Sequence, residues 1–362
     1  MTLLALPSTR EEAWRWSDLS GLPALADAAP RGGRPDVSAL WLNAGGPRLL
    51  FVDGKLDAAA SAPGGLQFGP VAARADGHPL ARLAEGDGWT LMLSADHAIA
   101  GPVEIVHVAT GGASHLAGRI ALADGAQAGI VETFVGDGWA NRLTAMTLGK
   151  GARLMRSVRL MQDSGFQSLR DQAEIGDGGS LVSIFLGVGG AGSRIDGALT
   201  LAGQGAFAEM GGALLARQDQ RHEAAVVLRH AAENGQSAQT WRAVSADSAT
   251  TSLAARVEVA RGAQKTDAEQ SLRGLLLKRG ATVNLKPELE IFADDVKCAH
   301  GATVGELDAA ALFYLASRGL PPAQAQALLT RAFVADALER IGDEAVRAAF
   351  MSDADRWLEA RP

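Results

Sequence analysis

The sequence DGAQAGIVETFVGDGWANRLTAMTLGKGA, residues 124–152, holds one copy of the unit that decides the fold. It begins at the glycine corner Asp124-Gly125-Ala126, continues through short runs of alternating apolar residues, and ends at a second glycine corner, residues 149–152. Alternation with a period of two is typical of β-strands, and glycine permits the tight turns that join them. The stretch therefore predicts short strands joined by glycine corners.

The same unit recurs from residue 99 to residue 304. Successive corners are first separated by 26, 27 and 27 residues, then by 57, which is close to two such steps, and finally by 18 and 21. The predicted corner glycines are Gly125, Gly151, Gly178, Gly205, Gly262, Gly280 and Gly301.

A repeat of roughly 20–28 residues built from short strands is typical of a solenoid, here a right-handed parallel β-helix. A β-sandwich is the alternative, but its turns recur every 8–12 residues or so, which is shorter than most of these steps. We therefore expect a mainly β, elongated molecule with helices confined to its two ends.

Composition agrees with many turns and few large side chains. The 362 residues include 43 glycines, and only 5% are aromatic. The net charge is −7 and the basic residues are scattered, which argues against a nucleic-acid partner. We find no apolar stretch long enough to cross a membrane and no secretory signal, and one cysteine fits a reducing compartment. We therefore expect a cytoplasmic protein without membrane association.

Three domains are expected. Residues 1–95 predict an N-terminal helical/β domain, residues 96–305 the β-helix, and residues 306–362 a C-terminal helical domain, because the apolar period becomes helical after Leu307.

Within the N-terminal part, Ser8 to Leu22 predicts a short amphipathic helix, and Asp53-Gly54 predicts a tight turn between two strands. The sequence of residues 58–95 predicts no definite structure.

Three local signals carry no chemistry by themselves. Gly187 to Gly192 fits the dinucleotide-binding pattern, but a strand follows it instead of a helix, so it predicts a corner. Gly149-Lys150 lacks the other residues of a phosphate-binding loop, so the chain is not expected to be an ATPase. His222 and His230 could be ligands, although solvated or corner-stabilising side chains are the commoner case, and their roles stay open.

The segment KPELEIFADDVKCAHGATVGEL, residues 286–307, contains the only cysteine and the densest run of acids. Cys298 and His300 are two residues apart, so in a strand their side chains leave the same face and could share a soft metal ion. The preceding Asp294 and Asp295 are expected to raise the pKa of the Cys298 thiol. Two ligands do not close a metal site, so the others would come from another polypeptide; alternatively, the cysteine is a small buried hydrophobe.

In the same segment, ADDVKCAHGATVGELD followed by LFYLASRG closely resembles the signature of the SufD proteins, scaffold subunits of the SufB/SufD family in Suf iron–sulfur cluster assembly. The resemblance extends upstream to Gly262 and downstream to about Ile341, with a weaker match over Pro7 to Leu22.

This resemblance implies a non-catalytic scaffold that pairs with SufB through the β-helix and holds the ATPase SufC through its C-terminal helices. It also implies a transient iron–sulfur cluster at the SufB interface, with His300 as the first candidate ligand and Cys298 as the second, and no cofactor stably bound to the isolated chain. Without SufB, the same surface is expected to form a homodimer. The alternative is a β-helical carbohydrate-active enzyme, a lyase or hydrolase, that uses Asp294 and Asp295 as acid and base.

Overall fold

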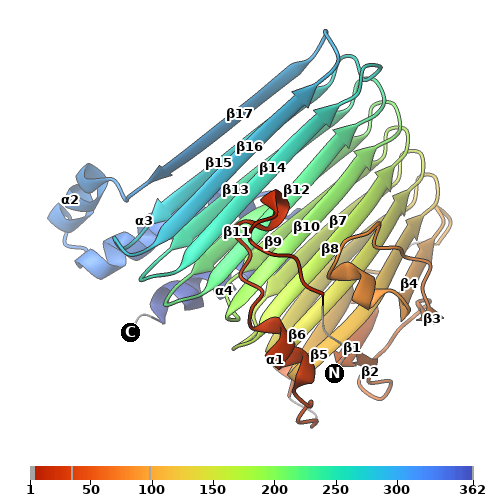
Figure 1. Cartoon of the computed structure of the whole chain (residues 1–362), viewed down its shortest axis with the longest axis horizontal. Helices are drawn as coiled ribbons and strands as arrows, with labels where there is room; N and C mark the ends of the chain where they lie inside the picture. The colour runs from red at the N-terminus through yellow and green to blue at the C-terminus, as the bar shows by residue number, and fades with distance from the viewer. Residues whose placement is uncertain (1–4, 34–35, 98, 361–362) are drawn as a thin grey trace.

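Two parallel β-sheets wind together into a β-solenoid of about seven turns, which confirms the predicted mainly β fold (Figure 1). The computed structural model describes residues 5–33, 36–97 and 99–360. Each coil gives one strand to each sheet, and strands two apart in the chain pair in parallel, as β8 does with β10 and β7 with β9.

We name the two sheets by their strand numbers. The even sheet contains β4 (Asp87–Leu93), the second halves of β5 (Val103–Leu122) and β6 (Gln127–Leu148), then β8 (Phe166–Ile175), β10 (Gly192–Leu201), β12 (Arg221–His230), β14 (Thr250–Val259) and β16 (Thr282–Ile291). The odd sheet contains β1 (Arg48–Val52), the first halves of β5 and β6, then β7 (Arg153–Leu160), β9 (Ser180–Gly187), β11 (Phe207–Ala216), β13 (Gln236–Ser245), β15 (Asp267–Leu276) and β17 (Lys297–Gly305).

The corners predicted in the first half of the solenoid are confirmed, and those in the second half are partly wrong. Gly125, Gly151, Gly178 and Gly205 all have positive φ, between 59° and 71°. The same position in the next two coils is taken by Asn234, with φ 60°, and by Lys265, with φ 59°, instead of glycine. Each of the six donates its backbone N–H to a carbonyl of the following corner, at 2.5 to 3.0 Å.

This ladder of corners explains the irregular spacing of the later glycines. The step of 57 residues contains the unrecognised corner at Asn234, and the turn after β14 has its left-handed residue at Lys265, three positions beyond Gly262. Gly280 belongs to a turn on the opposite edge, between β15 and β16, whereas Gly301 lies inside β17. The predicted corner at Gly301 is therefore wrong. The glycine-rich segment before β10 is a corner, as expected, between residues 187 and 192.

The N-terminal part extends the solenoid. β1 and β4 pair with the two halves of β5, while β2 (Lys55–Leu56) and β3 (Gln67–Pro70) form antiparallel pairs with β1 and β4. The turn at Asp53-Gly54 is confirmed, with positive φ at both residues. Two short 3-10 helices, Ser38–Leu40 and Ala81–Ala84, complete this region.

The helix predicted from Ser8 to Leu22 is wrong. That segment has a single 3-10 turn, Glu12–Trp14, and the helix α1 begins only at Leu22 and ends at Asp27. Trp14 explains the difference, because its buried ring packs 3.7 Å from the guanidinium of Arg194 on the even sheet. Tertiary packing has overridden the local helical pattern here.

The C-terminal helices are α2 (Ala309–Ser317), α3 (Pro322–Leu338) and α4 (Glu344–Glu359). Asp308 caps α2, as predicted, by accepting from the N–H of Ala310. The expectation that helices lie only at the ends is wrong, because α3 and α4 pack against the outer face of the odd sheet. Their shared apolar cluster includes Ile184, Leu186, Ala213, Leu215, Val244, Leu275, Val334, Leu338 and Phe350.

Between the two sheets, the interior holds charged groups as well as apolar ones. The buried guanidinium of Arg156 donates to Glu132 at 2.7 Å and also to Asp171. Glu132 lies 3.3 Å from His107, whose ring stacks on Phe134. Burial lowers the pKa of His107 to about 4, so this imidazole is neutral near pH 7.

His222 and His230 are also buried in this interior and are not solvated. His222 pairs with the hydroxyl of Ser193 at 2.8 Å, and His230 pairs with that of Ser237 at 2.8 Å, across the corner that follows β12. Burial lowers the pKa of each to about 4. His230 is therefore corner-stabilising, and His222 is a core histidine.

The ladder of corners predicts that replacing Gly205 lowers the free energy of unfolding. No atom would contact a Cβ at this position, so Gly205→Ala adds only the strain of a left-handed backbone and should lower the free energy of unfolding by about 1 kcal/mol. Gly262→Ala is the matched control, because Gly262 has open space and no positive φ; we expect a change within about 0.5 kcal/mol. Urea unfolding of both variants checks this, and equal effects would contradict the assignment of the corner.

The buried histidines predict a pH dependence of stability. Between pH 6.5 and about 4 the unfolded chain binds a proton at His222 that the folded chain does not, so the free energy of unfolding falls as the pH decreases. Wild type should lose about 2 kcal/mol more than His222→Gln between pH 7 and pH 5. The exposed His97 supplies the control, since His97→Gln should keep the wild-type slope in urea unfolding. A His222→Gln slope equal to that of wild type would contradict the prediction.

Candidate functional site

The last coil of the solenoid is open. In the described part of the chain, β16 pairs with β14 and β17 pairs with β15, and the other edge of each of these two strands has no partner. Figure 1 shows β17 as the outermost strand, next to α2. Large apolar side chains are exposed beside this edge, with Phe292 at 66% and Val304 at 45% exposure. An unpaired edge with exposed apolar side chains is a surface that another chain can extend.

Cys298 and His300 lie on β17, on the same face, as their spacing predicts. Their register neighbours on β15 are Ala268 and Gln270, both buried in the interior, so the pair leaves the strand on the inner side of the open coil. Cys298 is half-buried and packs against the core, whereas His300 is exposed. The two candidate ligands therefore differ in accessibility.

The pKa of the Cys298 thiol is raised, but the predicted cause is wrong. Burial is the larger cause, and the carboxylate of Asp267 on the neighbouring strand is the second. Asp294 and Asp295 are exposed in the corner before β17, where the backbone carbonyl of Asp295 accepts from Lys265 at 2.5 Å. A raised pKa keeps more of this thiol protonated near neutral pH, and the thiolate is the form that binds a metal ion.

Within residues 5–33, 36–97 and 99–360, no three His, Cys, Asp or Glu side chains come together as a metal site. Cys298 and His300 can supply two ligands at most, which fits a site completed by a second polypeptide. His222 and His230 lie in earlier coils, where each is bonded to a serine, so the structure does not bring them to this pair.

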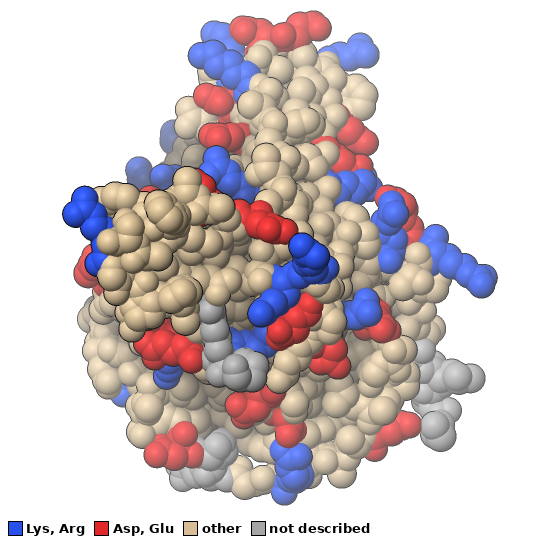
Figure 2. All heavy atoms as spheres, turned by 90° about the vertical axis from the view of Figure 1, so that its left-hand side faces the viewer, with Lys and Arg blue, Asp and Glu red and all other residues tan. Residues whose placement is uncertain are grey.

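A second exposed region lies on α2, and the sequence analysis did not single it out. None of the nine residues of this helix is buried, although most are apolar; Phe313 is 76% and Tyr314 57% exposed. Figure 2 shows an uncharged area on the side of the molecule that carries α2, with acidic and basic residues interspersed around it. An apolar helix without a fully buried residue is a surface suited to a partner.

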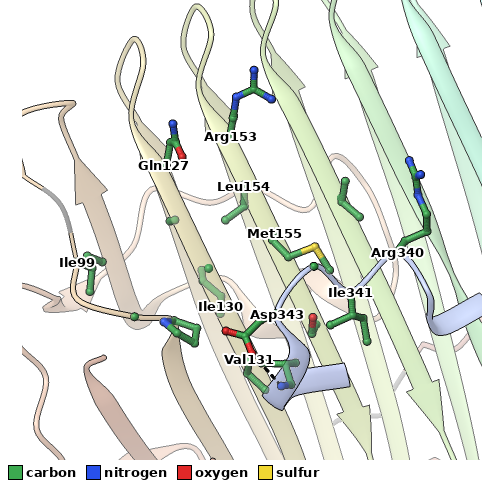
Figure 3. Close-up of a pocket in the computed structure, with 18 of the residues that line it drawn as sticks. Ile99, Gln127, Ile130, Val131, Arg153, Leu154, Met155, Arg340, Ile341 and Asp343 are labelled. Atoms are coloured by element: carbon green, nitrogen blue, oxygen red, sulfur yellow. Dashed lines mark hydrogen bonds between the residues drawn. The ribbon is translucent and has the colours of Figure 1, made fainter. Parts of the chain in front are cut away.

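A cleft of about 480 Å³ separates the α3–α4 connection from β6, β7 and β9 (Figure 3). Met155 and Ile341 are among its apolar lining residues. Two of its polar side chains serve the fold, since Arg340 donates to Glu209 at 2.7 Å and Asp343 caps α4.

None of the described helices is both long and apolar enough to span a membrane.

Comparison with known proteins agrees with this geometry. The family model of the SUF system FeS cluster assembly SufBD core domain matches residues 106–333. The chain is 28% identical to the iron–sulfur cluster assembly protein SufD of Escherichia coli, over 94% of this chain and 87% of that protein. It is 27% identical to an iron–sulfur cluster assembly SufBD family protein of Mycobacterium tuberculosis, over 98% of this chain and 90% of that protein. A shorter match, 29% identical over 44% of this chain, is to SufD of Bacillus subtilis. The solenoid, its open last coil and these similarities together mean that the chain belongs to the SufB/SufD family of iron–sulfur cluster assembly proteins.

Proposed function

We propose that the chain is a non-catalytic scaffold subunit that pairs with a SufB-type subunit through its last coil. The open edge of β16 and β17 carries this proposal. β16 has ten residues and β17 has nine, and alternate residues of each strand direct their backbone groups toward its unpaired edge. Backbone pairing with a similar coil would satisfy these donors and acceptors. In the absence of such a subunit, a second copy of the chain could occupy the same edge and give a homodimer.

A nascent iron–sulfur cluster is the cargo that this interface would hold. Cys298 and His300 leave the open coil toward the same side, and a thiolate and an imidazole both bind iron. Because the thiol of Cys298 has a raised pKa and is half-buried, His300 is the stronger candidate ligand. SufB would supply the remaining ligands.

The C-terminal helices would hold the ATPase SufC. α3 and α4 are fixed to the odd sheet by their apolar faces, which leaves α2 free to contact a partner with Phe313 and Tyr314. ATP-driven movement of SufC would then reach the open coil through the short connection between β17 and α2, residues 306–308.

A carbohydrate-active enzyme is the weaker alternative. Asp294 and Asp295 are both exposed in a corner, whereas an acid and base pair acts from a cleft that holds the substrate.

The SufC interface is tested by the double variant Phe313→Glu, Tyr314→Glu. Because α2 buries none of its residues, the variant should fold normally while SufC capture weakens at least about 10-fold. Met92→Glu is the control, since Met92 is 57% exposed at the far end of the solenoid and its change should leave capture intact. Removing residues 307–362 is a poorer test, because it would uncover the apolar face of the odd sheet. Undiminished SufC capture by the double variant would contradict this docking surface.

The ligand assignment is tested in complexes co-expressed with SufB and SufC and purified without oxygen. His300→Ala should preserve assembly, because the side chain is exposed, while iron and sulfide recovered with the complex fall several-fold. Cys298→Ser should have the smaller effect. Normal iron and sulfide in His300→Ala complexes would remove His300 from the site, and a larger loss from Cys298→Ser would reverse the order of the two ligands.

A further inference from the structure

The side chain of Gln270 is buried beneath the candidate ligand pair and has no hydrogen-bond partner among the residues that the structure describes. Only 1% of the residue is exposed, and both its amide nitrogen and its amide oxygen are unsatisfied. An amide buried in this way has lost its bonds to water without replacing them, which is uncommon in native folds. Gln162 in an earlier coil shares this condition, but Gln270 lies at the open end of the solenoid, next to the last strand, where a further group can reach it.

The register of the odd sheet points to that partner. Gln270 of β15 lies next to Gln239 of β13 on one side and next to His300 of β17 on the other. Parallel strands are about 4.8 Å apart, so paired side chains on one face lie one above the other. The amide nitrogen of Gln239 donates to the carbonyl of Arg256 at 3.1 Å, whereas its amide oxygen has no partner among the described residues and could accept only from the amide nitrogen of Gln270. The amide oxygen of Gln270 therefore still needs a donor, which Gln239 does not offer to it. The imidazole of His300 is exposed and can rotate toward Gln270.

We propose that Gln270 is the positioning residue of His300. Its amide oxygen accepts a hydrogen bond from one ring nitrogen of the imidazole, which leaves the lone pair of the other nitrogen for iron. A neutral imidazole has one donor and one acceptor nitrogen, so fixing the donor selects both the tautomer and the ring orientation. This inference rests on the proposed function, in which His300 is a ligand of the iron–sulfur cargo.

The two candidate ligands are unequal in this respect. Cys298 pairs in register with Ala268, whose methyl group offers no hydrogen bond, whereas His300 pairs with the amide of Gln270. Only one of the two positions therefore has a polar group in the layer beneath it. This difference favours His300 independently of the accessibility and pKa of the thiol.

The test compares Gln270→Met with wild type in the complex co-expressed with SufB and SufC. Methionine has nearly the same shape and removes an amide that makes no hydrogen bond in the free chain, so folding and assembly should be preserved. If Gln270→Met does not assemble, Gln270→Leu is the second variant. Iron release from the purified complex to excess bipyridyl should become about 10-fold to 100-fold faster, the usual cost of losing the residue that orients a metal-binding histidine.

Two comparisons separate positioning from a structural role. Gln239→Met removes a buried amide one coil away and should keep the wild-type release rate. In the double variant Gln270→Met, His300→Ala, release should equal that of His300→Ala alone, because Gln270 acts through the imidazole. Additive effects would overturn the inference.

The remaining outcomes distinguish the inference from the proposed function. If His300→Ala releases iron faster while Gln270→Met and Gln270→Leu both behave as wild type, the ligand stands and the positioning role of Gln270 is overturned. If His300→Ala also behaves as wild type, the proposed ligand itself fails, and the inference fails with it.

Discussion

Every coil of this molecule depends on backbone hydrogen bonds between parallel strands. The chain must therefore return to the same register after each turn of the solenoid. Phe166, Gly192 and Arg221 begin three successive strands of the even sheet and pair in register over ten residues, although the coils between them differ in length. The left-handed corner residues make this possible. They turn the chain at a fixed place and donate a hydrogen bond to the corner of the next coil. The extra residues of a longer coil therefore lie outside this corner.

The ladder also explains why charged side chains are tolerated inside the solenoid. A buried ion pair is favourable only when its geometry is held and its hydrogen bonds are made. Arg156 meets Glu132 from the preceding coil of the same sheet and Asp171 from the opposite sheet of its own coil, so two coils and both sheets must be correctly aligned before the charges are satisfied. The pKa of Glu132 is lowered to about 2 although its burial opposes ionisation, chiefly because Arg156 lies beside it. Such a network disfavours a slipped register, in which the charges would be buried without partners.

The ladder of parallel strands ends at β17, and the candidate site lies on this last strand. β17 keeps its inner face over the core but has no further coil above it, so Cys298 and His300 face an opening that would otherwise be filled by the next layer. α3 and α4 cover the flank of the odd sheet and leave this end free, while α2 projects beside it. The scaffold thus presents an edge, two candidate ligands and an apolar helix in neighbouring positions.

The sequence by itself determined the mainly β solenoid, its first four corners and the three C-terminal helices, because glycine spacing and apolar periodicity are local properties of the chain. It also determined that Cys298 and His300 share a face, since that follows from alternation in a strand. Only the tertiary structure decided that Asn234 and Lys265 replace glycine at later corners. Hydrogen bonds to neighbouring coils hold Lys265 in a left-handed conformation that lysine rarely adopts, whereas asparagine adopts it more readily. It alone decided that Trp14 anchors an irregular segment, that α3 and α4 cover the odd sheet, and that Gln270 lies beneath His300, since each depends on contacts between residues far apart in the chain.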